Sequence, residues 1–262
     1  MRVILLTHGG AELVIKEIGS KPDLDLVGVF IETKQTPERP FTEKLKRSIK
    51  YDGFFEMLKK FGGKLIGTSG AADEAATTGN PTVEAAESLG VPVQFVDDYH
   101  SDDSLDKIRN ANADLGIVFG TNIIKESVFG IPRLGSINLH QGLAPYYRGG
   151  PPVFWELFND EKEVGLTVHF VASKVDTGDI VLQKTVPLAY DFGYGDDFQA
   201  FIDDYRVKLR KDCAEMVAEA AALIASGEFP RIAQDITLGN RYRLPIKSEK
   251  DEMRRRLSRR KA

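Results

Sequence analysis

The stretch that organises this chain is residues 136–150, with the sequence Ser136-Ile-Asn-Leu-His-Gln-Gly-Leu-Ala-Pro-Tyr-Tyr-Arg-Gly-Gly150. Its opening residues alternate between polar and apolar, which is typical of a β-strand. Because strand side chains point to opposite faces in turn, Asn138 and His140 share one face. The glycines and the proline that follow break the strand into a loop. The stretch therefore predicts an amide and an imidazole side by side at the end of a strand.

A second stretch, Val175-Asp-Thr-Gly-Asp-Ile180, adds a carboxylate. Asp176 lies between two alternating apolar runs, residues 166–171 and 180–186, which we expect to pair as antiparallel strands around a turn. An amide can stabilise a developing oxyanion, and an imidazole with a carboxylate can move a proton. The two stretches together predict a catalytic trio of Asn138, His140 and Asp176.

The spacing of these residues resembles the signature of the folate-dependent formyltransferases, which include glycinamide ribonucleotide transformylase, methionyl-tRNA formyltransferase and the amino-sugar N-formyltransferases. The motif comprises Asn138-x-His140, Leu143-x-Pro145-x-Tyr147-Arg-Gly149 and Asp176-Thr-Gly-Asp-Ile180. The resemblance extends from about Pro92 to Leu188. Many relatives have Pro-Ser after the histidine, whereas this chain has Gln141-Gly142, so a serine hydroxyl is missing from the loop.

The resemblance implies an enzyme that moves a formyl group from 10-formyltetrahydrofolate to an amine through a tetrahedral oxyanion. In this reaction Asn138 would donate a hydrogen bond to the oxyanion. His140 would be a second donor or a proton carrier, and Asp176 would hold His140 and take or relay the proton that leaves the amine. The reaction needs no metal, and the sequence contains no convincing cluster of metal ligands.

The resemblance also implies two sets of binding residues, both in loops that follow strands. The folate is expected to lie against Phe119, Gly120, Thr121, Asn122, Ile123, Val175 and Thr177. The substrate is expected to contact Gly142, Tyr147, Arg148 and Gly149. For Arg148 a second interpretation is open, in which the guanidinium pins the loop by bonding to carbonyl groups.

The order of apolar runs predicts an α/β fold with a Rossmann-like, mostly parallel open sheet and flanking helices, followed by a helical C-terminal appendage. Residues 2–7, 11–18 and 26–32 read as strand, helix and strand, which is a βαβ unit. Ligands of such sheets bind beyond the carboxyl ends of the strands, here residues 114–121 and 136–140. We expect a catalytic domain over residues 1–190 and the appendage over residues 191–262.

Several helices are expected from apolar periodicity and from start signals. An amphipathic helix over residues 41–61 would pack on the sheet or bind a partner, and residues 64–67 could form a strand. Residues 82–89 would begin with Pro81 in the first turn. Residues 104–112 would be capped by Asp102, Asp103 or Ser104. Further helices are expected at residues 153–158 and 196–226, the second with one possible break.

Composition excludes some classes of protein. The 262 residues carry a formal charge of -4, which gives no general affinity for nucleic acid or for an anionic membrane. No apolar run approaches the roughly 20 residues of a membrane span, so we expect a cytoplasmic protein. The single Cys213 excludes an internal disulfide and lies at a core position of a helix. The basic tail Arg254-Arg-Arg-Leu-Ser-Arg-Arg-Lys261 is expected to be a solvated end.

The other histidines are ambiguous. His8 follows the first strand and reads as a solvated turn residue rather than a catalytic one. His100 lies in an acidic segment without a second histidine at ligand spacing, which indicates a charged surface loop. His169 lies in an alternating strand, where it would either line the site or be a satisfied structural residue.

The formyl acceptor is the open question. The purine-pathway relatives carry a Gly/Ser/Asn-rich phosphate loop after the first strand, whereas in this chain Glu12 would oppose a phosphate there. A small-molecule amine such as an amino-sugar nucleotide is therefore the favoured acceptor. The roughly 70 residues after Tyr190 are mostly helical, which leaves too little chain for the C-terminal barrel of the methionyl-tRNA enzymes. The alternatives are charged tRNA as acceptor, hydrolysis of 10-formyltetrahydrofolate, and a binding module without catalysis. A homodimer is plausible.

Overall fold

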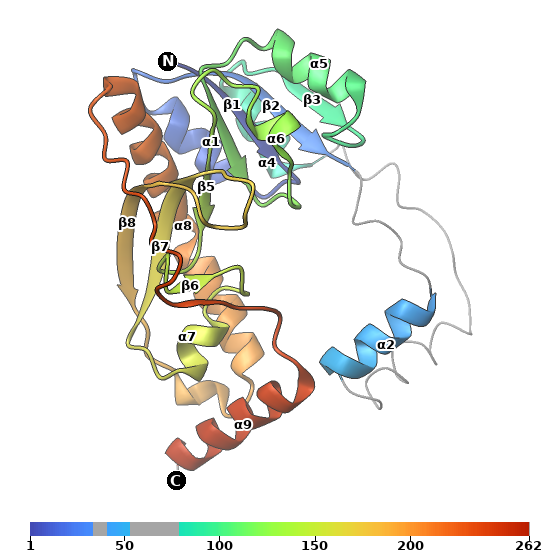
Figure 1. Cartoon of the computed structure of the whole chain (residues 1–262), viewed down its shortest axis with the longest axis vertical. Coiled ribbons are helices and arrows are strands. Elements are labelled where there is room, and N and C mark those ends of the chain that lie inside the picture. The colour runs from blue at the N-terminus through green and yellow to red at the C-terminus, as the bar shows by residue number, and fades with distance from the viewer. Residues whose placement is uncertain (34–40, 53–78, 262) are drawn as a thin grey trace.

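The structure, a computed structural model, describes residues 1–33, 41–52 and 79–261. The predicted helix over 41–61 appears as α2 (Phe41–Asp52), and its remainder and the predicted strand at 64–67 lie outside the described residues. α2 lies beside the C-terminal helix α9 (Figure 1).

The centre of the fold is a seven-stranded sheet in the order β3-β2-β1-β4-β5-β7-β8. Its strands are β1 (Arg2–Thr7), β2 (Asp25–Glu32), β3 (Val93–Val96), β4 (Leu115–Phe119), β5 (Ser136–His140), β7 (Glu163–Phe170) and β8 (Ile180–Pro187). The pairs from β3 to β5 are parallel, and β7 and β8 are antiparallel additions. The predicted mostly parallel, open α/β sheet is confirmed, as is the strand pair around Asp176.

Helices cover both faces of the sheet (Figure 1). Val3 and Leu5 of β1 belong to one apolar cluster, which also holds buried residues of α1 (Glu12–Gly19), α4 (Pro81–Ser88), α7 (Phe154–Phe158) and α8 (Phe198–Ser226). Ile4 and Leu6 belong to a second cluster with α5 (Asp102–Asn110) and α6 (Glu126–Phe129). Because β1 is covered on both faces, its run is continuously apolar rather than alternating.

Two details of the helices differ from prediction. α8 is a single helix of 29 residues without the possible break; it contains no proline or glycine and ends at Gly227 in the left-handed conformation. α5 is capped by Ser101, whose side chain accepts from Ser104 N, rather than by Asp102, Asp103 or Ser104. Ser101 is the residue with extended backbone before the first turn, which is what an N-cap requires.

The basic tail is not a solvated end. It forms α9 (Lys247–Lys261), which buries Met253 and Leu257 in the main apolar cluster. These two residues are four apart and share one face of the helix. Arg256 donates to Phe158 O at 2.8 Å and bonds to Glu252 within the helix. The expectation of a solvated end was wrong because the apolar pair inside the charge run provides an attachment face.

The division of the chain at residue 190 stays a prediction. α8 lies against α1 and contributes twelve buried residues, all of them to the cluster that also holds residues of β1 and β7. The 3-10 helix η2 (Phe192–Tyr194) leads into it. None of the helices in the described ranges is long and apolar enough to cross a membrane.

Candidate active site

The carboxyl end of β5 carries two of the predicted catalytic side chains. β5 pairs with β4 in parallel and with β7 in antiparallel orientation, so it is the strand at which the sheet changes direction. Asn138 lies opposite His169 across the β5–β7 pair, and His140 lies opposite Thr167. Cross-strand partners point to the same face. The strand pairing therefore adds His169 to the face that Asn138 and His140 share.

Asp176 reaches this face from the turn between β7 and β8. Its Oδ2 lies 3.2 Å from His140 Nδ1 and its Oδ1 lies 3.4 Å from His169 Nε2. The backbone N–H of Gly149 also donates to Oδ2, at 2.9 Å. Asp176 has φ of 53°, in the left-handed region that aspartate tolerates better than most residues. The predicted meeting of His140 and Asp176 is therefore present in the structure.

These contacts keep Asp176 ionised. Burial of the side chain, which is 11% exposed, raises the pKa of Asp176. The close approach of the His169 ring, the charge interactions with both histidines and the Gly149 N–H lower it by more, so the pKa of Asp176 lies below its usual value.

His140 is held in one tautomer. Its Nε2 lies 2.7 Å from the carbonyl oxygen of Tyr147, and because a carbonyl only accepts, Nε2 carries the hydrogen. Nδ1 is left facing Asp176. Burial lowers the pKa of His140, against the raising effects of the Asp176 charge and the Tyr147 carbonyl. A neutral imidazole with Nδ1 beside a carboxylate can take a proton there, since the carboxylate stabilises the resulting cation.

Gly142 explains the departure from the Pro-Ser sequence of many relatives. A Cβ atom at this position would lie 2.4 Å from His140 Nε2 and 2.6 Å from the Tyr147 carbonyl oxygen. Side-chain atoms do not approach this closely, so any other residue would displace the imidazole or the carbonyl. The hydrogen bond that sets the tautomer of His140 therefore depends on glycine at position 142.

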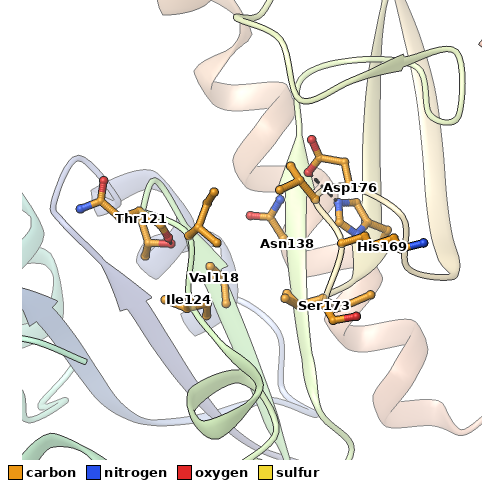
Figure 2. A pocket seen from close by; sticks show the side chains of 13 residues that line it. Val118, Thr121, Ile124, Asn138, His169, Ser173 and Asp176 are labelled. Atoms are coloured by element: carbon orange, nitrogen blue, oxygen red, sulfur yellow. Dashed lines mark hydrogen bonds and ion pairs between the residues drawn. The ribbon is translucent and has the colours of Figure 1, made fainter. Parts of the chain in front are cut away.

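The first cavity at this site, of about 190 Å³, lies between the loop after β4 and the Asp176 turn (Figure 2). Asn138, His169 and Asp176 line it together with four of the predicted folate-binding residues, Thr121, Asn122, Ile123 and Val175. Phe119 and Gly120 line a different cavity, and Thr177 lines neither and donates to Lys174 O. The predicted folate set is thus divided by the structure between two places.

His169 is a wall residue of the first cavity that also bonds to the fold. Its Nδ1 donates to Phe170 O at 2.7 Å, while its buried Nε2 faces Asp176 without a hydrogen-bond partner. Of the two interpretations left open by the sequence, the structure supports a position in the site. The deciding observation is the strand register that places His169 opposite Asn138, which the alternation in the sequence did not specify.

A second cavity, of about 550 Å³, lies beyond the other side of the β5 end. His140 and Gln141 line it, as do Gly10 after β1, Phe119 and Gly120 after β4, and one face of α8. The α8 residues are Asp203, Arg206, Val207 and Arg210, which follow helical spacing. Sequence reasoning missed this wall because nothing in the α8 sequence indicates which strand end it lies beside.

The four residues predicted to contact substrate surround the His140–Asp176 pair, and none of these described residues lines either cavity. Gly142 packs on the imidazole, Tyr147 supplies its carbonyl and Gly149 its N–H. The buried Arg148 donates to Pro145 O and Ile236 O, both at 3.0 Å, which is the loop-pinning interpretation. Their roles toward substrate stay predictions.

The remaining candidates have structural partners. His8 lies 2.6 Å from Glu32 Oε2, and His100 accepts from Lys125 N. Cys213 is buried in the core, as predicted, and burial raises the pKa of its thiol to about 11. Among the described residues, no group of three or more His, Cys, Asp or Glu side chains has an arrangement that could hold a metal ion.

Comparison with known proteins identifies relatives of this site. Residues 71–195, which include Asn138, His140 and Asp176, match the family model described as formyl transferase. The methionyl-tRNA formyltransferase of Parabacteroides distasonis is 34% identical over 150 residues, which cover 57% of this chain and 44% of the relative. The chain therefore spans about half the length of the curated relatives that it matches.

Solved structures share the fold. Glycinamide ribonucleotide transformylase 1 from Symbiobacterium toebii superposes with a TM-score of 0.58 at 19% identity, over 88% of this chain and 94% of that one. A sugar N-formyltransferase from a Shewanella species superposes with a TM-score of 0.56 at 15% identity, over 98% of this chain and 87% of that one. The Rossmann-like fold expected from the sequence is thus confirmed, along with the resemblance to formyltransferases.

Proposed function

Because residues 71–195 match the formyl transferase family model, we propose that the protein moves a formyl group from 10-formyltetrahydrofolate to an amine of a small molecule. The observation that carries this proposal is the position of the Asn138, His140 and Asp176 trio between two cavities. Asn138 and Asp176 face the first, His140 faces the second, and Asp176 lies 3.2 Å from His140.

The first cavity is the proposed site of the formyl donor. Its walls are loop segments, residues 121–124 and 171–176, which offer backbone donors and acceptors to a flat, polar ring such as a pterin. The buried His169 Nε2 has no hydrogen-bond partner, with Asp176 Oδ1 3.4 Å away, and His169 lines this cavity, so a bound group can satisfy it. Asn138, in the same wall, is placed to donate to the oxyanion that forms on the formyl carbon.

The second cavity is the proposed site of the acceptor. His140 Nδ1 takes the proton as the amine nitrogen bonds to the formyl carbon, and Asp176 stabilises the imidazolium that results. The folate nitrogen leaves with a proton in return. Arg206 and Arg210 on α8 give the cavity cationic groups, and Arg210 already pairs with Glu12. Since that pair neutralises Glu12, the acidic turn after β1 does not oppose an anionic acceptor.

An amino-sugar nucleotide fits this cavity in charge and in kind, because it joins an amine to anionic phosphates. Charged tRNA is the second candidate, since the curated relatives are named methionyl-tRNA formyltransferases. Against it, arginines of α9 are already paired: Arg254 with Asp251, and Arg255 and Arg256 with Glu252. A homodimer stays a prediction.

The test is turnover of 10-formyltetrahydrofolate with a panel of acceptors. The panel contains amino-sugar nucleotides, glycinamide ribonucleotide, charged initiator tRNA and water alone, with tetrahydrofolate release and formylated product both measured. We expect formylation of a sugar nucleotide. Product on tRNA only would support the second candidate, release without product would indicate a hydrolase, and the absence of folate binding by calorimetry would overturn the proposal.

A further inference from the structure

A segment far from the catalytic trio in sequence holds the turn that carries Asp176. We name residues 231–243 the C-terminal strap. Arg231 forms an ion pair with Asp179 at 2.8 Å, and Ile232 exchanges backbone hydrogen bonds with Ile180. Gln234 Nε2 donates to the carbonyl oxygen of Gly178 at 2.6 Å. The strap therefore makes direct contact with residues 178–180, which follow Asp176 in the turn.

The other end of the strap pairs with the loop after β5. β9 (Asn240–Arg241) and β6 (Tyr147–Arg148) form a small parallel pair. Asn240 N donates to Tyr146 O at 3.0 Å, and Tyr242 N donates to Arg148 O at 2.8 Å. Successive carbonyls of an extended chain point to opposite sides. Because its two neighbours point to the strap, the carbonyl of Tyr147 points away from it, toward His140 Nε2.

Aromatic stacking fixes this end of the strap. The ring of Tyr242 stacks on Tyr147 with centroids 5.1 Å apart and planes 9° apart, and on Trp155 with centroids 5.0 Å apart. Asn159 Nδ2 donates to the hydroxyls of both tyrosines. Trp155 Nε1 donates to the Arg243 carbonyl at 2.8 Å. A ring that stacks on two others and is hydrogen-bonded through its hydroxyl resists rotation, so β9 is held in register with β6.

We propose that the C-terminal strap sets the tautomer and the orientation of His140 by fixing the Tyr147 carbonyl, with Tyr242 as the positioning residue. Gln234 does the same for the turn of Asp176. No described residue of the strap lines either of the two large cavities, so it acts through Tyr147 and Gly178 rather than on substrate. The catalytic consequence rests on the proposed function, whereas the effect on the imidazole does not.

Two glycines provide a matched pair of variants. Gly239 in the strap has φ of 72°, and a Cβ atom there would lie 2.2 Å from Tyr146 Cα and 2.7 Å from Tyr146 O. Gly227, before the strap, has φ of 79° and no atom within 4 Å of such a Cβ. Gly239→Ala and Gly227→Ala therefore incur a similar backbone cost, but only Gly239→Ala pushes the strap off the loop.

The first readout is the ¹⁵N spectrum of the histidine rings, which distinguishes a hydrogen on Nε2 from one on Nδ1 and needs no substrate. We expect the Nε2–H form of His140 in the wild type and in Gly227→Ala, and a mixture of tautomers in Gly239→Ala. We also expect kcat of Gly239→Ala to fall at least tenfold below that of Gly227→Ala, with little change in the KM for the formyl donor. Identical spectra and equal kcat values in the two variants would overturn the proposal.

A second pair keeps the test valid if Gly239→Ala does not fold. Tyr242→Ala removes the stacked ring, whereas Tyr242→Phe keeps it and loses only the hydroxyl. We expect Tyr242→Ala to behave as Gly239→Ala, and Tyr242→Phe to restore the Nε2–H signal and most of kcat. Should both variants keep the wild-type tautomer, the strap has no positioning role. If the tautomer changes as expected but no variant shows turnover, including the wild type, the proposed function fails and the strap proposal stands.

Discussion

The two halves of the sheet treat their polar side chains differently. In the parallel half, from β3 to β4, the groups at the strand ends bond to one another. Glu32 accepts from Tyr99 N at 2.9 Å and lies 2.6 Å from His8, and the Tyr99 hydroxyl bonds to the backbone of Thr7 and Phe30. These contacts satisfy the polar groups named here, while other residues that follow β1 and β4 line the cavities.

In the antiparallel half, β5 to β8 with the strap, polar atoms stay without partners. The described residues include four buried side-chain atoms that lack a hydrogen bond, and three of them, Gln141 Oε1, His169 Nε2 and Gln234 Oε1, belong to this half. Residues of β5, of β7 and of the Asp176 turn also line the cavities. Unsatisfied buried groups cost stability, and a ligand in the cavities can satisfy Gln141 and His169, whereas Gln234 lines neither cavity. His8 and His169 both lie in or next to a strand, but His8 is paired with Glu32 and His169 Nε2 lacks a hydrogen bond, so bonding and not position separates the two.

The sharpest test of this comparison removes one side chain from each half. Asn138→Ala should lower kcat by about 10²–10³, because it deletes the proposed oxyanion donor, while folate affinity changes little. His100→Ala, in the parallel half, should leave kcat within about twofold, since His100 bonds only to Asp98 and Lys125 among the described contacts. Steady-state kinetics with calorimetry measures both. Near-normal turnover of Asn138→Ala would remove the catalytic assignment from the antiparallel half.

A smaller effect is expected from restoring the serine that many relatives have at position 142. Gly142→Ser should lower kcat at least tenfold, because its Cβ would displace His140 Nε2 from the Tyr147 carbonyl. Gly193→Ser serves as the control, since its Cβ would meet only the side chain of Asp191, at 3.0 Å. Kinetics together with the ¹⁵N ring spectrum measures the displacement. An active Gly142→Ser enzyme with the wild-type tautomer would show that the tautomer is not fixed by this contact.

The smallest effect concerns two glutamates, one in each half. Burial raises the pKa of Glu156, beside His140, to about 7, and Glu161 adds to the shift. A raised folded-state pKa gives stability that is full below the unfolded value of about 4.5 and is lost as the pH rises through about 7. Glu156→Gln should therefore increase the free energy of unfolding at pH 8 by on the order of 1 kcal/mol, and by less at pH 5.

Glu32→Gln is the matched change in the parallel half. It removes a charged acceptor from Tyr99 N and from His8, so it should lower the free energy of unfolding where Glu156→Gln raises it. Urea unfolding at pH 5 and pH 8 measures both variants. Destabilisation of Glu156→Gln at pH 8 would mean that its carboxylate is well bonded, and the contrast between the two halves would not extend to carboxylates.

Local patterns in the sequence were enough to predict the parallel sheet, the antiparallel pair around Asp176 and the shared face of Asn138 and His140. Each of these features depends on how often apolar residues recur along one helix or one strand. That pattern involves only residues that are close in the sequence. The catalytic trio could be predicted for the same reason, since its members lie at strand ends and in one turn. The cavity-lining positions of Thr121, Asn122, Ile123 and Val175 were expected from the resemblance to the formyltransferases, and the rule that ligands bind beyond strand ends agrees with them.

Only the tertiary structure decided which segments that are remote in the sequence contact one another. The wall of Arg206 and Arg210 exists because α8 packs beside β5, and the pairing of the strap with the loop fixes which nitrogen of His140 carries the hydrogen. The attachment of α9 through Met253 and Leu257 overrode the charge of the tail. Such contacts are selected by register and close packing across the whole molecule, and no local period in the sequence encodes them.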